Sequence, residues 1–180
     1  MTPAVVRRAD VAALAALRRA WTDELAGAPI DDPDFEHTFS EWYATERSRR
    51  TNWIAEISDE PVGMLNLVEF RRMPRPGRPQ SRWGYVSNVF VLAAYRDQGI
   101  GEALLDAAMS HARVHGYARV VLAPSERSVP FYRRAGFGEA DMLLAHPAAG
   151  EPEPAPSQSE RATSQSASAI SQSAPATSQS

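Results

Sequence analysis

An arginine and two glycines stand where an apolar-striped helix begins, in the stretch "YRDQGIGEALL" (residues 95–105). Glycine inside a helix costs roughly 1 kcal/mol relative to alanine, so Gly99 and Gly101 indicate that another group must approach the backbone there. The first turn of a helix presents N–H groups without partners and the positive end of the helix dipole. Arg96 adds a formal positive charge beside them. The segment therefore predicts a binding site for a phosphate or pyrophosphate group.

Several familiar kinds of site are excluded by missing residues. A Rossmann loop needs a third glycine where this chain has Leu104, and a P-loop needs a lysine, which the chain lacks altogether. Cysteine is also absent, which excludes disulfides, thiolate metal sites and cysteine nucleophiles. His111 and His115 lie one helical turn apart but lack the glutamate and third ligand of a zinc site. We therefore expect no metal site.

Two motifs at the right separation point to one enzyme family. The loop fits the pattern R/Q-x-x-G-x-G/A, and "SERSVPFYRRAGF" (residues 125–137) ends in Tyr-x-x-x-Gly-Phe. Together with the preceding "NVFVLAAY" (residues 88–95), they resemble the cofactor motifs of the GNAT N-acetyltransferase superfamily. The resemblance covers most of residues 4–145. It implies the GNAT fold, with acetyl-CoA as the cosubstrate and no metal.

The resemblance also implies roles for individual residues. It places the backbone of Val89, Phe90 and Val91 beside the pantetheine arm, which would pair with them like a neighbouring strand. Ser125 replaces a common asparagine and would bond the cofactor through its hydroxyl. The pyrophosphate would be held mainly by main-chain N–H groups of the loop, in which we include Arg96, Asp97, Gln98, Gly99, Ile100, Gly101 and Glu102.

Tyr132 occupies the position of the family's general acid. A tyrosine hydroxyl with a pKa near 10 can protonate a thiolate whose conjugate acid resembles cysteine, with a pKa of about 8.5. The alternative is a tyrosine that only packs against the core. The attacking amine also needs a base, for which Glu24 and Glu69 are the candidates, acting through water. Each of these carboxylates could equally be a solvated surface group, so the base stays open.

The spacing of hydrophobic residues predicts the helices and strands that must position these residues. Strands are predicted at 4–9, 51–58, 61–70, 83–92, 118–124 and 137–146, the fifth of them short and buried. Helices are predicted at 11–26, with Asp10 as N-cap and Gly27 as its end, at 34–50, from Ile100 to Gly116, and at 128–136. The order β-α-α-β-β-β-α-β-α-β predicts a mixed, mostly antiparallel α+β sheet, with one parallel crossover in the middle.

Composition separates a folded domain from a tail. Residues 1–146 form the predicted GNAT domain, in which 18 arginines and 19 acidic residues leave a net charge of −1. Residues 147–180 are rich in Ser, Gln, Ala and Pro and are predicted to be disordered. The chain shows no signal peptide and no apolar run long enough to span a membrane, so we expect a soluble cytoplasmic protein.

The sequence thus predicts an acetyl-CoA-dependent N-acetyltransferase that acts on a primary amine of a small molecule, peptide or protein by direct attack in a ternary complex. Another acyl group or an oxygen acceptor is the rival within enzymes, and a non-catalytic acyl-CoA-binding sensor is the rival outside them. The acceptor is expected near the first two helices, among Trp21, Glu24, Phe35, Phe39, Trp42 and Tyr43. The five arginines of residues 71–82 lack interleaved aromatics, so nucleic acid is not the expected partner. A homodimer stays open.

Overall fold

The computed structural model describes residues 3–140, which contain one five-stranded sheet in the order β1-β2-β3-β4-β5. The neighbouring strands pair antiparallel except β4 and β5, which are parallel. The predicted mixed α+β sheet and its parallel crossover are confirmed. The elements are β1 (Val5–Arg8), α1 (Val11–Ala26), α2 (Phe35–Glu46), β2 (Arg50–Ile57), β3 (Glu60–Arg71), β4 (Arg82–Val91), the 3-10 turn η1 (Ala93–Tyr95), α3 (Ile100–Val114), β5 (Tyr117–Val121), the 3-10 turn η2 (Glu126–Ser128) and α4 (Val129–Arg134).

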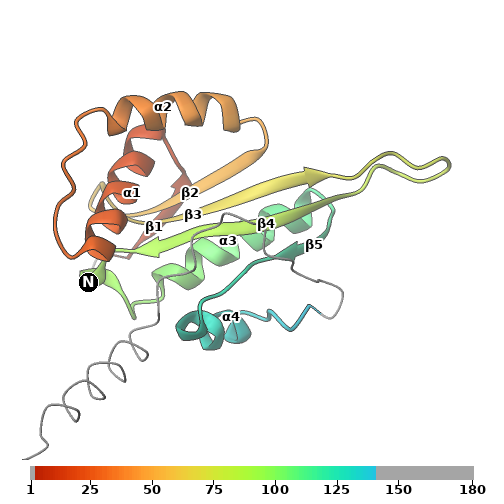
Figure 1. Ribbon diagram of the computed structural model, residues 1–180. Coiled ribbons are helices and arrows are strands. Elements are labelled where there is room, and N and C mark those ends of the chain that lie inside the picture. The colour runs from red at the N-terminus through yellow and green to blue at the C-terminus, as the bar shows by residue number, and fades with distance from the viewer. Residues whose placement is uncertain (1–2, 141–180) are drawn as a thin grey trace, which may run out of the picture. The chain divides into compact units, whose positions relative to one another are not determined.

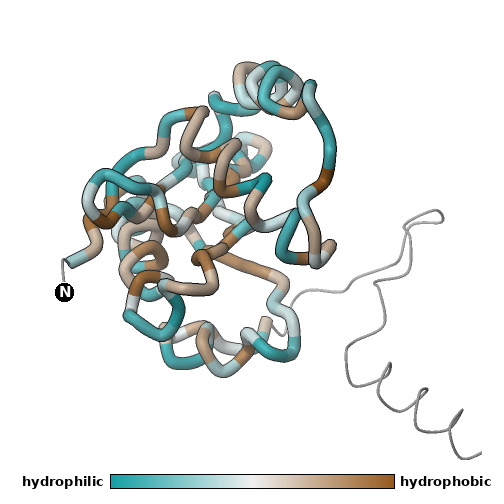
Figure 2. Tube along the Cα trace, turned by 90° about the vertical axis from the view of Figure 1, so that its left-hand side faces the viewer, coloured by the Kyte–Doolittle hydropathy of each residue, from teal (hydrophilic) through white to brown (hydrophobic). Residues whose placement is uncertain are grey.

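Helices cover both faces of the sheet: α1 and α2 lie on one face and α3 on the other (Figure 1). Neighbouring strand residues point to opposite faces, so adjacent side chains of β3 enter different clusters. Met64 packs with the α1 side, whereas Leu65 is fully buried against α3. Hydrophobic residues gather between the helices and the sheet, while hydrophilic ones occupy outer turns (Figure 2).

The ends of α1 follow the predicted capping chemistry. The side chain of Asp10 accepts a hydrogen bond from the backbone N–H of Ala13 at 2.8 Å, which satisfies one of the free donors of the first turn. Gly27 ends the helix in the left-handed conformation with φ 75°, which a residue with a Cβ adopts only with strain. These caps fix where α1 begins and ends, and Leu14 and Leu17 are buried on the face that meets the sheet.

Strands β3 and β4 continue beyond the body of the molecule as a long hairpin (Figure 1). We call residues 70–83 the arm. Phe70 and Trp83 stack across its base with ring centroids 4.3 Å apart, and the N–H of Arg72 donates to the carbonyl of Ser81 at 2.9 Å. Beyond that bond the tip carries exposed arginines and prolines, with Met73 87% exposed.

The structure differs from the predictions at the C-terminal end of the domain. Strand β5 was expected to be buried, but Ala118 and Arg119 are exposed and its other residues only half-buried. This prediction was wrong because, within residues 3–140, β5 pairs with β4 alone and lies at the edge of the sheet. The predicted strand 137–146 begins in residues 137–140, which form no strand, and the rest of it lies outside the described residues, as does the tail 147–180. No described helix is long and apolar enough to cross a membrane.

Candidate active site

A β-bulge in β4 interrupts the sheet at Asn88. Asn66 pairs with Ser87 and Met64 pairs with Phe90, so the two β4 residues between them face one residue of β3. Asn88 has φ 54°, in the left-handed region that asparagine tolerates better than most residues. The extra residue reverses which side chains point to each face. Beyond the bulge Val89 and Val91 therefore pack on the α3 side, whereas Phe90 packs against α1.

The loop between β4 and α3 is shaped by two left-handed residues, Asp97 with φ 60° and Gly99 with φ 78°. No side chain caps α3, so the N–H groups of its first turn have no capping partner among residues 3–140. A Cβ at Gly99 would meet nothing within 4 Å, so this glycine is needed for its backbone conformation. A Cβ at Gly101 would lie 3.4 Å from the ring of Phe131, an ordinary van der Waals contact, so packing against α4 does not require a glycine there.

Arg96 forms hydrogen bonds with residues of two elements beside the loop. Its Nε donates to the carbonyl oxygen of Val91 at 2.9 Å, and one Nη lies 2.6 Å from both carboxylate oxygens of Glu24 on α1. The predicted rim cation and one of the two predicted bases thus form one ion pair. The guanidinium links the end of β4 to α1 beside the loop.

The other loop residues differ in what they can offer a ligand. The side chain of Ile100 is buried in the core, so only its main chain can face the loop, whereas Glu102 is exposed in the first turn of α3. Gln98 donates from Nε2 to the carbonyl of Ala94 at 3.2 Å. The hydroxyl of Ser125 lies 3.0 Å from that of Ser128, which also bonds the Ser125 carbonyl.

Tyr132 lies in the same cluster as Val89 and Val91. Its ring makes edge contacts with Phe131 and Phe137, at centroid distances of 4.9 and 5.9 Å. Burial raises the pKa of Tyr132, and the neighbouring Tyr85 raises it further. The hydroxyl is therefore protonated at neutral pH, which is the state a general acid needs.

Glu69, the second predicted base, lies on β3 opposite Gly84 of β4, near the base of the arm. Its carboxylate accepts hydrogen bonds from Arg71, Arg82 and Tyr117 at 2.9, 3.0 and 2.9 Å. Burial raises the pKa of Glu69, but these three hydrogen bonds outweigh burial and hold its pKa below the usual range. Burial, together with the hydrogen bond to Glu69, raises the pKa of Tyr117 to about 12.

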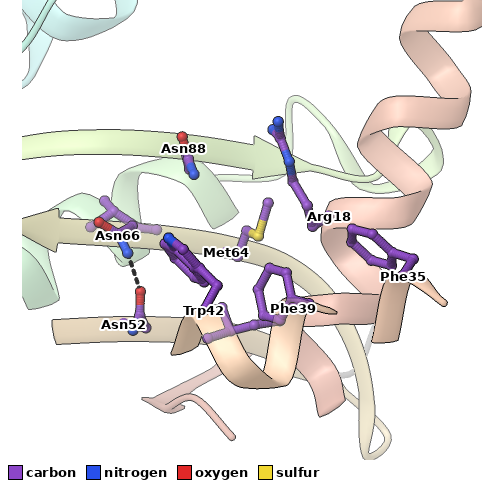
Figure 3. A pocket seen from close by; sticks show the side chains of 10 residues that line it. Arg18, Phe35, Phe39, Trp42, Asn52, Met64, Asn66 and Asn88 are labelled. Carbon is purple, nitrogen blue, oxygen red and sulfur yellow. Dashed lines mark hydrogen bonds between the residues drawn. The ribbon is translucent and has the colours of Figure 1, made fainter. Parts of the chain in front are cut away.

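A cavity of about 240 Å³ opens between α1, α2 and the strands, next to the bulge. Figure 3 shows Arg18 and Asn88 on one side of it and the rings of Phe39 and Trp42 on the other. Helix α2 has no buried residue, because its apolar side faces this space. The cavity is lined by Leu14, Arg18, Phe35, Phe39, Trp42, Asn52, Met64, Leu65, Asn66 and Asn88.

A buried amide pair forms the floor of this cavity. Asn66 donates from Nδ2 to Oδ1 of Asn52, and its own Oδ1 accepts from Arg50 at 3.0 Å and from Ser87 at 3.1 Å. Arg50 is held in turn by Glu46 at 2.7 Å. Within residues 3–140, Nδ2 of Asn52 and the side chain of Asn88 have no hydrogen-bond partner, so they remain available to a ligand or to water.

Part of this cavity was predicted from the sequence. Phe35, Phe39 and Trp42, expected on the acceptor side, line it, whereas Trp21 stacks on Phe90 with centroids 5.6 Å apart. Arg18 and Asn52 were not predicted. A signal for Asn52 was present, because an asparagine directly before the apolar residues 53–55 of a strand needs a partner or a function.

A sequence profile described as "Acetyltransferase (GNAT) family" matches residues 14–137. A curated relative, glucosamine 6-phosphate N-acetyltransferase of Trypanosoma brucei brucei, is 36% identical over 76 residues, which are 42% of this chain and 50% of that protein. The alignment thus spans half the length of that relative.

Solved structures share the fold. A GCN5-related N-acetyltransferase from Ralstonia eutropha is 25% identical, with a TM-score of 0.63 over 82% of this chain and all of that one. A predicted acetyltransferase from Clostridium acetobutylicum, crystallised with acetyl-CoA, is 20% identical, with a TM-score of 0.63 over 81% and 96% of the two chains. The profile covers well over half of the sequence, and the predicted resemblance is confirmed: the chain belongs to the GNAT family of acetyltransferases.

Proposed function

We propose that the protein transfers the acetyl group of acetyl-CoA to a primary amine of a small molecule or peptide, by direct attack in a ternary complex. One observation carries the proposal. The bulge at Asn88 borders the cavity, and residues 89–91 lead from it to the uncapped first turn of α3. A cosubstrate with a pyrophosphate at the helix and a reactive end at the bulge would therefore meet an acceptor in the cavity.

Residues of this chain fit such a cosubstrate. The uncapped N–H groups at the start of α3 suit a pyrophosphate, and the left-handed residues Asp97 and Gly99 turn the backbone toward that end of the helix. The main chain of residues 89–91 would pair with the pantetheine arm. The acetyl-CoA in the Clostridium structure and the activity in the name of the trypanosomal relative support this assignment.

Tyr132 is the proposed general acid. Acetyl-CoA supplies an activated thioester, whose carbonyl carbon the neutral amine attacks. As the C–N bond forms, the C–S bond breaks, and the hydroxyl of Tyr132 gives its proton to the departing thiolate. The raised pKa of Tyr132 keeps that proton in place until the thiolate develops. No cysteine or lysine is present to form a covalent acyl-enzyme.

Glu24 is the better of the two proposed bases. The Glu69 carboxylate is held by three donors that lower its pKa, and these donors must be overcome before it can take a proton. Within the described residues the Glu24 carboxylate has one partner, Arg96, and 39% of its side chain is exposed beside the loop. A water between Glu24 and the acceptor would carry the proton away from the attacking nitrogen.

The test is thiol release from acetyl-CoA with a panel of amines, for the wild type and Tyr132→Phe. We expect the substitution to lower kcat by at least about a hundredfold while acetyl-CoA still binds in calorimetry. Tyr117→Phe is the matched control, because it removes the hydroxyl of another half-buried tyrosine with a raised pKa, near the opposite end of the sheet.

Two results would contradict the proposal. Acetyl-CoA binding without turnover on any amine would favour the sensor, and equal kcat in the wild type and Tyr132→Phe would remove Tyr132 from the mechanism.

A further inference from the structure

The cavity carries one charge, and it is positive. Arg18 is the sole charged residue among its ten lining residues, and no carboxylate lines it. A polyamine or another acceptor with several ammonium groups would find no counter-charge inside and would pay the full cost of desolvation. The lining therefore discriminates among amines by their charge.

Arg18 has no acidic partner within residues 3–140. Other arginines around the same helices are paired: Arg19 with Glu36 at 2.8 Å, and Arg50 with Glu46 at 2.7 Å. The guanidinium of Arg18 lies 4.9 Å from the ring centroid of Trp21, a contact that leaves its N–H donors free. Such a planar set of donors matches the two oxygens of a carboxylate or phosphate.

The other lining residues favour a ligand with a small, apolar body. Phe35, Phe39 and Trp42 form a wall of rings with successive centroids 5.7 and 5.2 Å apart. Leu14 and Met64 add aliphatic surface. The volume of about 240 Å³ falls below the range of roughly 300–1,000 Å³ usual for drug-sized ligands, so the space suits a molecule the size of an amino acid.

The polar groups are arranged for an amine beside an anion. Figure 3 shows Arg18 and Asn88 on the same side of the cavity, across from the rings of Phe39 and Trp42. Asn88 lies in the bulge, where the proposed reactive end would arrive, and its amide oxygen can accept from an amine. The free Nδ2 of Asn52 adds a donor in the lining of the cavity. An α-amino acid carries its amine and carboxylate on one carbon, which places them together in this way.

We propose, on the basis of the function proposed above, that the acceptor is a small amine with one anionic group that Arg18 binds and an apolar body that the aromatic wall holds. An α-amino acid with an aromatic side chain is the simplest such molecule. An amino-sugar phosphate offers the same pairing of amine and anion with a polar body. The acceptor class excludes polyamines.

Matched amines test the proposal. L-phenylalanine and 2-phenylethylamine differ by one carboxylate, glucosamine 6-phosphate and glucosamine differ by one phosphate, and spermidine represents polycations. Thiol release gives kcat/KM for each on the wild type, on Arg18→Gln and on Arg47→Gln, which removes an exposed arginine at the end of α2. Thermal shift with CoA present reports acceptor binding independently of turnover.

We expect Arg18→Gln to lower kcat/KM for L-phenylalanine at least tenfold, through KM, and to change 2-phenylethylamine less than twofold, while Arg47→Gln changes neither. Because each amine is compared with itself on two proteins, differences in amine basicity cancel.

If Arg18→Gln lowers kcat/KM for glucosamine 6-phosphate and not for L-phenylalanine, the anionic group is a phosphate, and the proposal that the acceptor has an apolar body is overturned. A preference for spermidine, or an equal effect of Arg18→Gln on both phenyl amines, overturns the whole inference. Acceptor binding that needs Arg18, without turnover, supports the inference and defeats the proposed function; neither binding nor turnover defeats both.

Discussion

The loop before α3 and the acceptor cavity meet at the bulge but are built in different ways. The loop takes its shape from consecutive residues, two of them left-handed, and offers mainly backbone N–H groups. The cavity takes side chains from α1, α2, β2, β3 and β4, residues up to 74 positions apart from Leu14 to Asn88. A site made of main chain tolerates many side chains, whereas a site made of side chains changes with each substitution. The two halves should therefore respond differently to substitution.

The largest expected effect falls on Glu24, which links the two regions through Arg96. We expect Glu24→Gln to lower kcat about a hundredfold and to remove the acidic limb of the pH–rate profile, because the amide cannot accept the proton. Glu69→Gln is the matched change on the other candidate base. It should leave kcat within about twofold, because the Glu69 carboxylate accepts structural hydrogen bonds from Arg71, Arg82 and Tyr117. An acidic limb that persists in Glu24→Gln would remove Glu24 from the role of base.

The next effect separates the loop from the cavity. Gly99→Val places a β-branched residue at φ 78° and should weaken acetyl-CoA binding by roughly tenfold or more in calorimetry, since such strain costs about 1–3 kcal/mol. Gly77→Val is the control, because Gly77 has φ 67° and similarly open surroundings but lies at the tip of the arm. Equal loss of acetyl-CoA affinity in both variants would mean that general destabilisation, and not the loop, is responsible.

A third substitution acts on the cavity alone. Asn66→Ala leaves Oδ1 of Asn52 without its buried donor, whereas Arg50 keeps its partner Glu46. The substitution should lower the free energy of unfolding by about 1–3 kcal/mol in urea titration. Ser87→Ala removes one donor to the same oxygen and should cost about 1 kcal/mol. Acetyl-CoA affinity should hold in both variants, and a parallel loss would show that loop and cavity are one cooperative unit.

The smallest effect concerns the ion pairs at the far end of the sheet. Because the folded state lowers the pKa of Glu69, its contribution to stability is present above its ordinary pKa of 4.5 and is lost as pH falls through the lower, folded-state value. The wild type should therefore lose more unfolding free energy than Glu69→Gln when urea titrations are repeated from pH 6 down to pH 3. Parallel curves for the two proteins would contradict this linkage.

Residues that act locally were predictable from sequence, and those that act at a distance were not. Asp10 and Gly27 signal the ends of α1 through bonds to near neighbours, and the loop before α3 is one short motif. The ion pair of Arg96 with Glu24 joins residues 72 positions apart, so no local pattern contains it. The sequence does not signal the bulge either, because the residue in the left-handed conformation is Asn88 and not a glycine. The cavity depends on which face α2 turns to the sheet, and packing decides that.

The arm offers a point at which the chain can be divided into two pieces. Arg75 and Arg78 are each followed by proline, which blocks trypsin, so the Arg72–Met73 bond at the exposed tip is a favoured cleavage site. A cut there leaves α1, α2 and most of the cavity in residues 1–72, and the loop with Tyr132 in residues 73–180. Pairing of β3 with β4, from Gly63 and Val91 to Arg71 and Arg82, would hold the fragments together. The same position suits a split gene, in which thiol release reports that two fused proteins have met.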